Sequence, residues 1–243
     1  DSGTYNQTAA LTVTGDMQIN GGTFNGSTAS DAIDVNGNFS QTGGTFTSTN
    51  GTMTVEDNFS RTAGTFTHNS GTVTFDGTNQ TISGSTTFNH FTKTVAAAAT
   101  LTFTAGTTQT IAGTLTLQGA SGQLLSLRSS VNGTQWNINP QGTRTIAFLD
   151  VKESNNTNAT AINACGTGSV NSGNNTNWHF GVVISGNVYT DLGVTAIANG
   201  VSIVLIVNGT STGTTTTGGG TGAYSFSEII LAATSIAGWC SAT

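Results

Sequence analysis

Apolar residues recur along the first part of the chain at a step of about 20 residues. One column is aromatic, with successive members 19, 22, 20 and 22 residues apart: Tyr5, Phe24, Phe46, Phe66 and Phe88. A period of this length with apolar residues in fixed columns is typical of a solenoid, in which each repeat packs only on its neighbours. The pattern therefore predicts stacked coils.

Inside each repeat the apolar residues alternate with threonine, as in Thr12-Val13-Thr14 and Thr65-Phe66-Thr67. A period of two predicts β-strands, with valine and phenylalanine pointing inward and threonine outward. Two further apolar columns follow the same step: Leu11, Ile33, Met53 and Val73, then Val13, Val35, Val55 and Phe75. Because such short strands cannot bury their own apolar face, they must stack, which predicts an all-β chain built on a parallel β-helix.

Regularity is highest over residues 22–88 and breaks at 89–100. A Gln-Thr-Ile phrase at Gln80–Ile82 returns 29 residues later at Gln109–Ile111, and we expect an insertion or a bulge in that coil. The aromatic residues Trp178 and Phe180, which follow an Asn- and Gly-rich turn, predict a lid on the last coil.

The pattern changes after residue 181. Strand-like stretches at 182–189, 201–207, 211–217 and 223–227 are separated by glycine- and asparagine-rich turns, which predicts a small antiparallel β-sandwich. We therefore expect two domains, a parallel β-helix over residues 1–181 and the sandwich over 182–243. About 60 residues bury little core on their own, so the sandwich is expected to be completed by a neighbouring subunit.

Composition points to the cell exterior. Charged residues make up 7% of the chain, against roughly 25% in an average globular domain, and the net charge is −6. Nucleic-acid binding is not expected, because it requires a basic stripe. No apolar run is long enough to span a membrane. A start at Asp1, without Met or a signal peptide, suggests a processed, exported chain that is extracellular or on a cell surface.

Two parts of the chain resemble known protein families. Residues 3–180 resemble the right-handed parallel β-helix repeats of bacterial and archaeal cell-surface proteins, of the adhesin and filamentous-haemagglutinin type. The Gly-Thr-Phe and Gln-Thr-Ile phrases and the stretch Asn171–Trp178 carry this likeness. The resemblance implies the architecture and transfers no functional residues.

Residues 183–227 resemble the carboxypeptidase-regulatory-like module, a small transthyretin-like sandwich. The likeness rests on Ile184–Tyr189, Val201–Val207 and Gly222–Phe226. Such modules continue with more strands, whereas this chain stops at Thr243, so the resemblance implies a sandwich that lacks strands.

Acidic and amide side chains also recur in the turns, in the column Asp16, Asn38, Asn58 and Thr78. Asp16, Glu56, Asp57 and Asp76 are candidate ligands for Ca²⁺, which prefers several oxygen ligands. The alternative is structural, because stacked Asn and Asp side chains bond to one another and to backbone groups.

The remaining reactive side chains give weaker signals. Cys165 and Cys240 form one disulfide or remain two buried thiols. His68, His90 and His179 lack metal-type spacing and are expected on the surface or as caps. We expect no catalytic residue and no cofactor; a polysaccharide-active β-helix enzyme is a lesser alternative, since Arg61 near Glu56 and Asp57 is a weak cluster.

Outward Thr-x-Thr pairs raise a further alternative, a threonine array that binds ice. Lys93 and Asn36 are expected to interrupt that array. The leading hypothesis is a non-enzymatic structural subunit of an extracellular filament, polymerising head to tail through β-strand addition or end stacking, with residues 1–14 as the donor strand. The runner-up is an adhesin stalk with glycan partners. Trp136, Trp178 and Trp239 lie in strand-like or closing contexts, which disfavours a sugar platform.

Overall fold

The computed structural model describes residues 3–191, 193–207 and 210–229. Every regular element within these ranges is a β-strand. The chain divides into two compact units, Asp1–Trp178 and His179–Thr243, and each is described by itself. The predicted boundary between residues 181 and 182 lies beside this division and stays a prediction.

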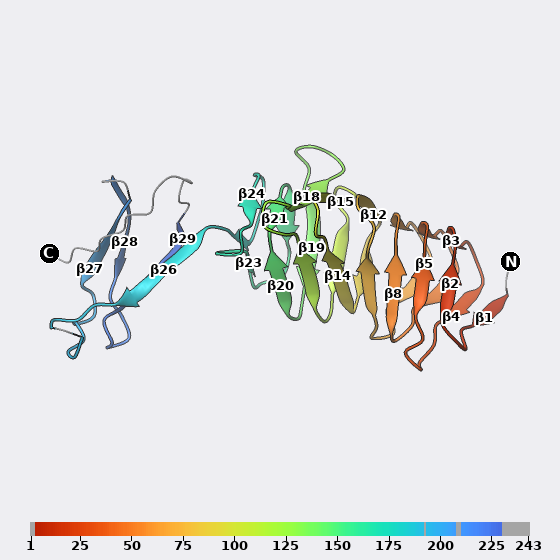
Figure 1. Ribbon diagram of the computed structural model, residues 1–243, viewed down its shortest axis with the longest axis horizontal. Coiled ribbons are helices and arrows are strands. Elements are labelled where there is room, and N and C mark those ends of the chain that lie inside the picture. The colour runs from red at the N-terminus through yellow and green to blue at the C-terminus, as the bar shows by residue number, and fades with distance from the viewer. Residues whose placement is uncertain (1–2, 192, 208–209, 230–243) are drawn as a thin grey trace. The chain divides into compact units, whose positions relative to one another are not determined.

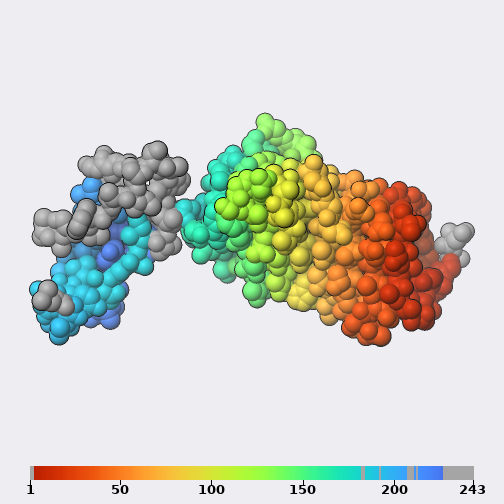
Figure 2. Space-filling view, viewed as in Figure 1, coloured from red at the N-terminus to blue at the C-terminus, as the bar shows by residue number. Residues whose placement is uncertain are grey.

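The first unit is a parallel β-solenoid of about eight coils, stacked from β1 to β24 in Figure 1 and continuously packed in Figure 2. Its largest sheet takes one strand from each coil. These eight strands are β3 (Met17–Ile19), β6 (Phe39–Gln41), β9 (Phe59–Arg61), β12 (Gln80–Ser83), β15 (Ala99–Phe103), β18 (Leu125–Ser129), β21 (Leu149–Val151) and β24 (Val170–Asn171).

A seven-stranded sheet forms the second side. Its strands are β2 (Leu11–Val13), β5 (Ile33–Val35), β8 (Thr52–Val55), β11 (Thr72–Phe75), β14 (His90–Thr94), β17 (Leu115–Gln118) and β20 (Arg144–Ala147). The register confirms both further apolar columns. Leu11 pairs with Ile33, Ile33 with Met53 and Met53 with Val73, and the column from Val13 to Phe75 is paired in the same way. Coils average about 22 residues, slightly more than the predicted step.

The third side is divided between two four-stranded sheets. The first contains β1 (Thr4–Asn6), β4 (Thr23–Asn25), β7 (Thr45–Thr47) and β10 (Thr65–Thr67); the second contains β13 (Thr86–Phe88), β16 (Thr108–Ile111), β19 (Trp136–Pro140) and β22 (Ser154–Asn156). The aromatic column is in register from Tyr5 to Phe66, and Phe88 begins the second sheet.

The two Gln-Thr-Ile phrases do not occupy equivalent positions. The first is β12 of the eight-stranded sheet, where Gln80 pairs with Leu101, and the second is β16 on the third side, where Gln109 pairs with Thr86. The predicted insertion is therefore wrong. An inward Gln and an inward Ile suit a strand of either sheet, so the phrase does not fix the side of the solenoid.

The core is an aromatic stack. Phe39, Phe46, Phe59, Phe75 and Phe88 have no exposed surface, and the Phe39 and Phe59 rings stack with centroids 4.7 Å apart. The threonines that alternate with these residues face outward, as predicted. At the other end Trp178 in β25 (Trp178–His179), which pairs with β23 (Ile162–Asn163), is buried and donates to Ser154 Oγ over 3.0 Å.

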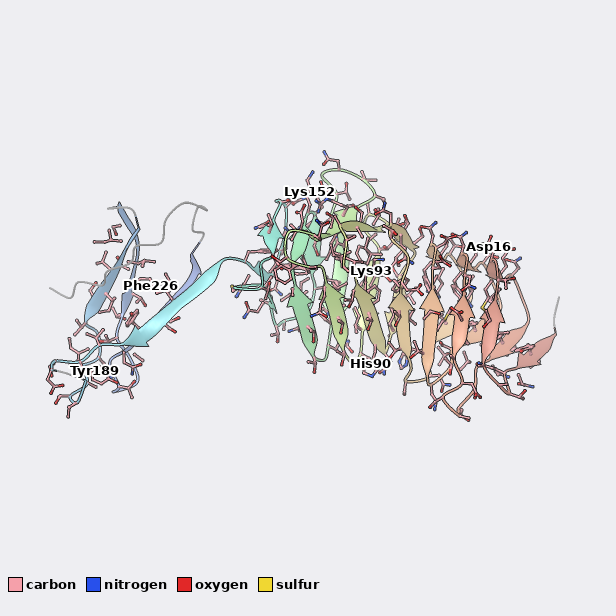
Figure 3. The ribbon with its side chains drawn as sticks, in the orientation of Figure 1. Asp16, His90, Lys93, Lys152, Tyr189 and Phe226 are labelled. Carbon is pink, nitrogen blue, oxygen red and sulfur yellow. The ribbon has the colours of Figure 1, made fainter. Side chains whose placement is uncertain are left out.

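The second unit contains two antiparallel two-stranded sheets, as the sequence pattern indicates. Strand β26 (Val182–Asn187) pairs with β29 (Ala223–Ile229), and β27 (Ser202–Val207) pairs with β28 (Thr210–Thr216). Phe226 of β29, labelled in Figure 3, is buried. The predicted turn at Asn208 and Gly209 lies outside the described residues, as does everything after Ile229.

Candidate functional site

The main candidate site is the N-terminal end of the solenoid, formed by β1, β2 and β3 and called the open end below. Each of these strands pairs with a described strand on one side only. Alternate residues of a strand form backbone hydrogen bonds to opposite neighbouring strands. Leu11, Val13 and Met17 form theirs to the second coil, so the backbone groups of the residues between them face away from that coil. The N–H and C=O groups of Thr4, Asn6, Thr12 and Gln18 point toward the edge.

The apolar core is also accessible at the open end. A cavity of about 310 Å³ is lined by residues that include Tyr5, Ile19 and Phe24. Tyr5 is 50% exposed although its ring stacks on Phe24 with centroids 5.1 Å apart, whereas Phe46, two coils further in, is fully buried. Such a surface combines unpaired backbone groups with exposed core, the combination that recruits a further strand.

The predicted donor strand, residues 1–14, is not a free arm. Thr4–Asn6 and Leu11–Val13 already pair with β4 and β5 as strands of the first coil. Apolar Leu11 and Val13 pack on the second coil, which holds the segment there. What this region offers is therefore an edge, and that part of the prediction is corrected.

The second unit has open edges of its own. Within the described residues each strand pairs on one side only, and a two-stranded sheet is marginally stable alone. Strand β27 is apolar on both faces: Val204 and Ile206 are 48% and 54% exposed, while Ile203 and Leu205 are half-buried. A strand of this composition is suited to burial on both sides.

The predicted turn column is a polar ladder. Asp16 Oδ1 accepts hydrogen bonds from Asn38 N and Nδ2, both 2.9 Å, and Asn38 Oδ1 accepts the same pair from Asn58 at 3.1 and 3.0 Å. The bonds from Asn38, the backbone one above all, lower the pKa of the Asp16 carboxyl. Thr81 N, rather than Thr78, donates to Asn58.

The other candidate calcium ligands are not gathered around Asp16, which Figure 3 labels near the N-terminal end. Glu56 and Asp76 follow the paired residues Val55 and Phe75 on neighbouring coils, and both are exposed, as is Asp57. No group of three or more His, Cys, Asp or Glu side chains suited to a metal ion occurs in the described part of the chain. Calcium binding stays a prediction.

Lys93, labelled in Figure 3, is buried in the core. Its Nζ donates to Gln80 Oε1 over 2.6 Å, to Phe75 O over 3.5 Å and to Gly77 O. Burial lowers the pKa of Lys93 to about 8, although nearby Asp76 acts in the opposite direction. The expectation that Lys93 interrupts an outward array is wrong, because it faces the same side as Phe91.

The outer face of the seven-stranded sheet carries a column of polar side chains in register, six of them threonines. Its members are Thr12, Asp34, Thr54, Thr74, Thr92, Thr116 and Thr145. One acidic residue, Asp34, interrupts the threonines, and its Oδ1 accepts a hydrogen bond from Thr54 Oγ1. Ice binding stays a prediction, now with this register in its favour.

Two histidines act as caps, one of the two roles expected for them. Nδ1 of His68 accepts a bond from Ser70 N over 3.0 Å, and Nδ1 of His90 accepts one from Thr114 N over 2.8 Å. Burial, and secondarily the nearby His90, lower the pKa of His68. His179 is exposed in β25.

The cysteine and tryptophan predictions extend beyond the described residues. Cys165 is half-buried, while Cys240 and Trp239 lie outside the described residues, so the disulfide stays a prediction. Trp136 is fully buried and stacks on Phe103, and Trp178 is 7% exposed. Neither of these two rings presents a face to a ligand.

An ion pair that sequence reasoning missed joins Arg128 of β18 to Asp150 of β21. Ser172 Oγ also donates to Asp150 Oδ1. The two charged residues are 22 positions apart and lie on neighbouring coils, a step close to one coil length. Such a step is the only signal in the sequence that points to this pairing.

No family model, curated protein or solved structure matches this chain. Over the described residues there is also no helix whose length and apolar character would let it cross a membrane.

Proposed function

We propose that this protein is a non-enzymatic structural subunit of an extracellular filament or cell-surface assembly, and that copies associate head to tail through their β-sheet edges. The observation that carries the proposal is the open end. Three strand edges lie at this end beside an accessible apolar cavity, and within the described residues no backbone partner covers the edge groups of Thr4, Asn6, Thr12 and Gln18.

Electrostatics favours close approach at this end. Residues 3–15 contain no charged side chain, so a second polypeptide meets no like charge on the first coil before Asp16. An uncharged strand edge is open to pairing with another chain, because charges and proline are among the features that normally protect such edges.

The complementary surface is β27 and its neighbours in the second unit. Exposed Val204 and Ile206 gain burial when another element covers them, and each of the small sheets gains a partner strand. Since the two surfaces differ, the contact is heterologous, and heterologous contacts that do not close into a ring build open filaments.

The resemblances described above support a place on a cell surface. They imply adhesin-type β-helix coils and a transthyretin-like module. The same rod without self-association is the runner-up, an adhesin stalk. Burial of Trp136 and Trp178 removes two aromatic rings from the surface of such a stalk, which favours the structural subunit.

Electron microscopy of the purified chain tests the proposal. We expect filaments with a constant axial repeat for the wild type and dispersed particles for Tyr5→Lys, which places a charge on the open end where the side chain is already 50% exposed. Thr62→Lys, at an exposed turn away from that end, is the matched control and should still assemble. Dispersed wild-type particles at high protein concentration would contradict the proposal and favour the stalk.

A further inference from the structure

The third side of the solenoid is interrupted between β10 and β13. Strand β10 ends the first four-stranded sheet and β13 begins the second, so the two face one another without forming a described ladder. A cleft of about 190 Å³ opens at this break, called the side cleft below. It is lined by Arg61, Phe66, Ser85, Thr86, Thr87, Thr108 and Thr110.

Arg61 brings an uncompensated positive charge to the side cleft. Its guanidinium donates to Ser85 O over 2.5 Å and to Gly64 O over 2.8 Å, which bridges the two coils. Neither acceptor is charged, and the ion pairs of the described residues, Arg128 with Asp150 and Lys152 with Glu153, do not include Arg61. Its Nε is buried without a partner.

Capping of carbonyls does not by itself require arginine here. Gln41 occupies the same register position one coil earlier, directly paired with Arg61. Its neutral amide donates to Thr65 O over 3.0 Å and to Gly43 O over 3.3 Å, the same task that Arg61 performs for the next turn. A neutral side chain can therefore make these carbonyl hydrogen bonds, and the positive charge of Arg61 is not required for them.

The other walls of the side cleft supply an aromatic surface and hydroxyls. Phe66 is partly exposed by the break, whereas its stacking neighbours Phe46, Phe59 and Phe88 are fully buried. Thr86 is 4% exposed, lines the cleft, and its Oγ1 has no hydrogen-bond partner. The side chain of Thr86 faces the same side as buried Phe88, so the hydroxyls offered to the cleft are those of Thr87 and Thr110, which pair in register.

We propose that the side cleft binds one sugar unit that carries a carboxylate, a hexuronate. A guanidinium with free N–H groups recognises a carboxylate by charge-assisted hydrogen bonds. The partly exposed ring of Phe66 packs against the apolar face of the sugar, while Thr87 and Thr110, which pair in register, lie where their hydroxyls can bond to it. At about 190 Å³ the cleft is smaller than the roughly 300–1,000 Å³ of drug-sized sites, which suits one ring. This proposal does not depend on self-assembly.

Titration of the ¹⁵N-labelled Tyr5→Lys protein, which is expected to stay dispersed and carries its substitution at the open end, with sodium glucuronate, followed by NMR, tests the proposal. We expect shifts confined to amides of β9, β10, β13 and β16, and at least tenfold weaker binding of glucose, which lacks the charge, and of acetate, which lacks the ring. Equal binding of acetate would show a general anion site and overturn the sugar assignment. Equal binding of glucose, or no localised shifts, would overturn the role of Arg61.

The chain supplies its own matched variant. Arg61→Gln reproduces the residue found at position 41, so it should keep the carbonyl caps and the fold while weakening glucuronate binding at least tenfold. Arg144→Gln is the control, because Arg144 also caps a carbonyl, Pro140 O over 2.6 Å, but lies away from the side cleft. Unchanged affinity in Arg61→Gln would refute the proposal. If that variant does not fold, the glucuronate, glucose and acetate comparison on the Tyr5→Lys protein with Arg61 intact decides the matter.

Discussion

Buried polar side chains hold the corners of the solenoid. Gln41, Gln80 and Gln109 are each at most 2% exposed, and their amide groups donate to turn carbonyls, at Gly43, Asp57 and Gly84 respectively. An unpaired buried carbonyl costs about 1–3 kcal/mol, so these residues stabilise turns of irregular length. Lys93 performs this task with a charge, which carries a desolvation cost.

Stability should therefore rise in alkali. The unfolded lysine has its ordinary pKa of 10.5, whereas the pKa of the folded one is about 8, so the unfolded state binds more protons between these values. The free energy of unfolding should increase from pH 8 to 10.5 by up to about 3 kcal/mol, because a tenfold difference in proton affinity is worth about 1.4 kcal/mol. Urea unfolding at pH 7.5, 9 and 10.5 measures it.

Lys93→Met is the control for that titration. The variant lacks the titrating group but keeps a long apolar side chain, so its unfolding free energy should be flatter over the same pH range, whatever its absolute value. An equal rise in both proteins would assign the effect to other groups, such as tyrosines.

The sequence contained the information that places Lys93. In the stretch Phe91-Thr92-Lys93 the alternation puts residue 93 on the same side as Phe91, and the structure follows it. The residue type instead predicts an outward side chain, because lysine is almost never fully buried unless it is paired. The partners that make burial possible, Gly77 and Gln80, belong to the preceding coil and are set by stacking.

For the strands, the sequence predicts which residues align in a column but not how the strands are divided into sheets. Leu11, Ile33, Met53 and Val73 align in the sequence and in the register, because every coil repeats the same inward position. The aromatic column hides the break at β10, since Phe88 continues the stack of rings while its backbone belongs to a new sheet. The side cleft could not be predicted for this reason.

Residues of the aromatic column should contribute differently to the free energy of unfolding, depending on where they lie along the stack of coils. Phe46 is fully buried between two coils, so Phe46→Ala should lower the free energy of unfolding by about 3–5 kcal/mol. Tyr5 occupies the same column at the open end, so Tyr5→Ala should cost less than about 1 kcal/mol. Urea unfolding of both variants at low protein concentration gives the comparison. Equal losses would mean that the open end is as well packed as the interior.

For the whole chain, the candidate surfaces for assembly are strand edges, and the polar side chains of the turns are of secondary importance. The sequence singled out both regions, residues 1–14 as a donor strand and residues 182–243 as a sandwich completed by a neighbouring subunit. The role of the first was misjudged, because residues 4–13 are compatible both with a free strand and with a coil. Pairing with the second coil, a long-range property, decides between these two possibilities.

Hydrogen–deuterium exchange at low and high protein concentration tests the central claim of edge-mediated assembly most directly. Peptides covering residues 3–19, which contain the edge amides of Thr4, Asn6, Thr12 and Gln18, should gain protection as concentration rises. Peptides covering residues 33–61, already paired on both sides, should exchange at the same rate throughout. Equal exchange of residues 3–19 in dilute and concentrated protein would contradict the account.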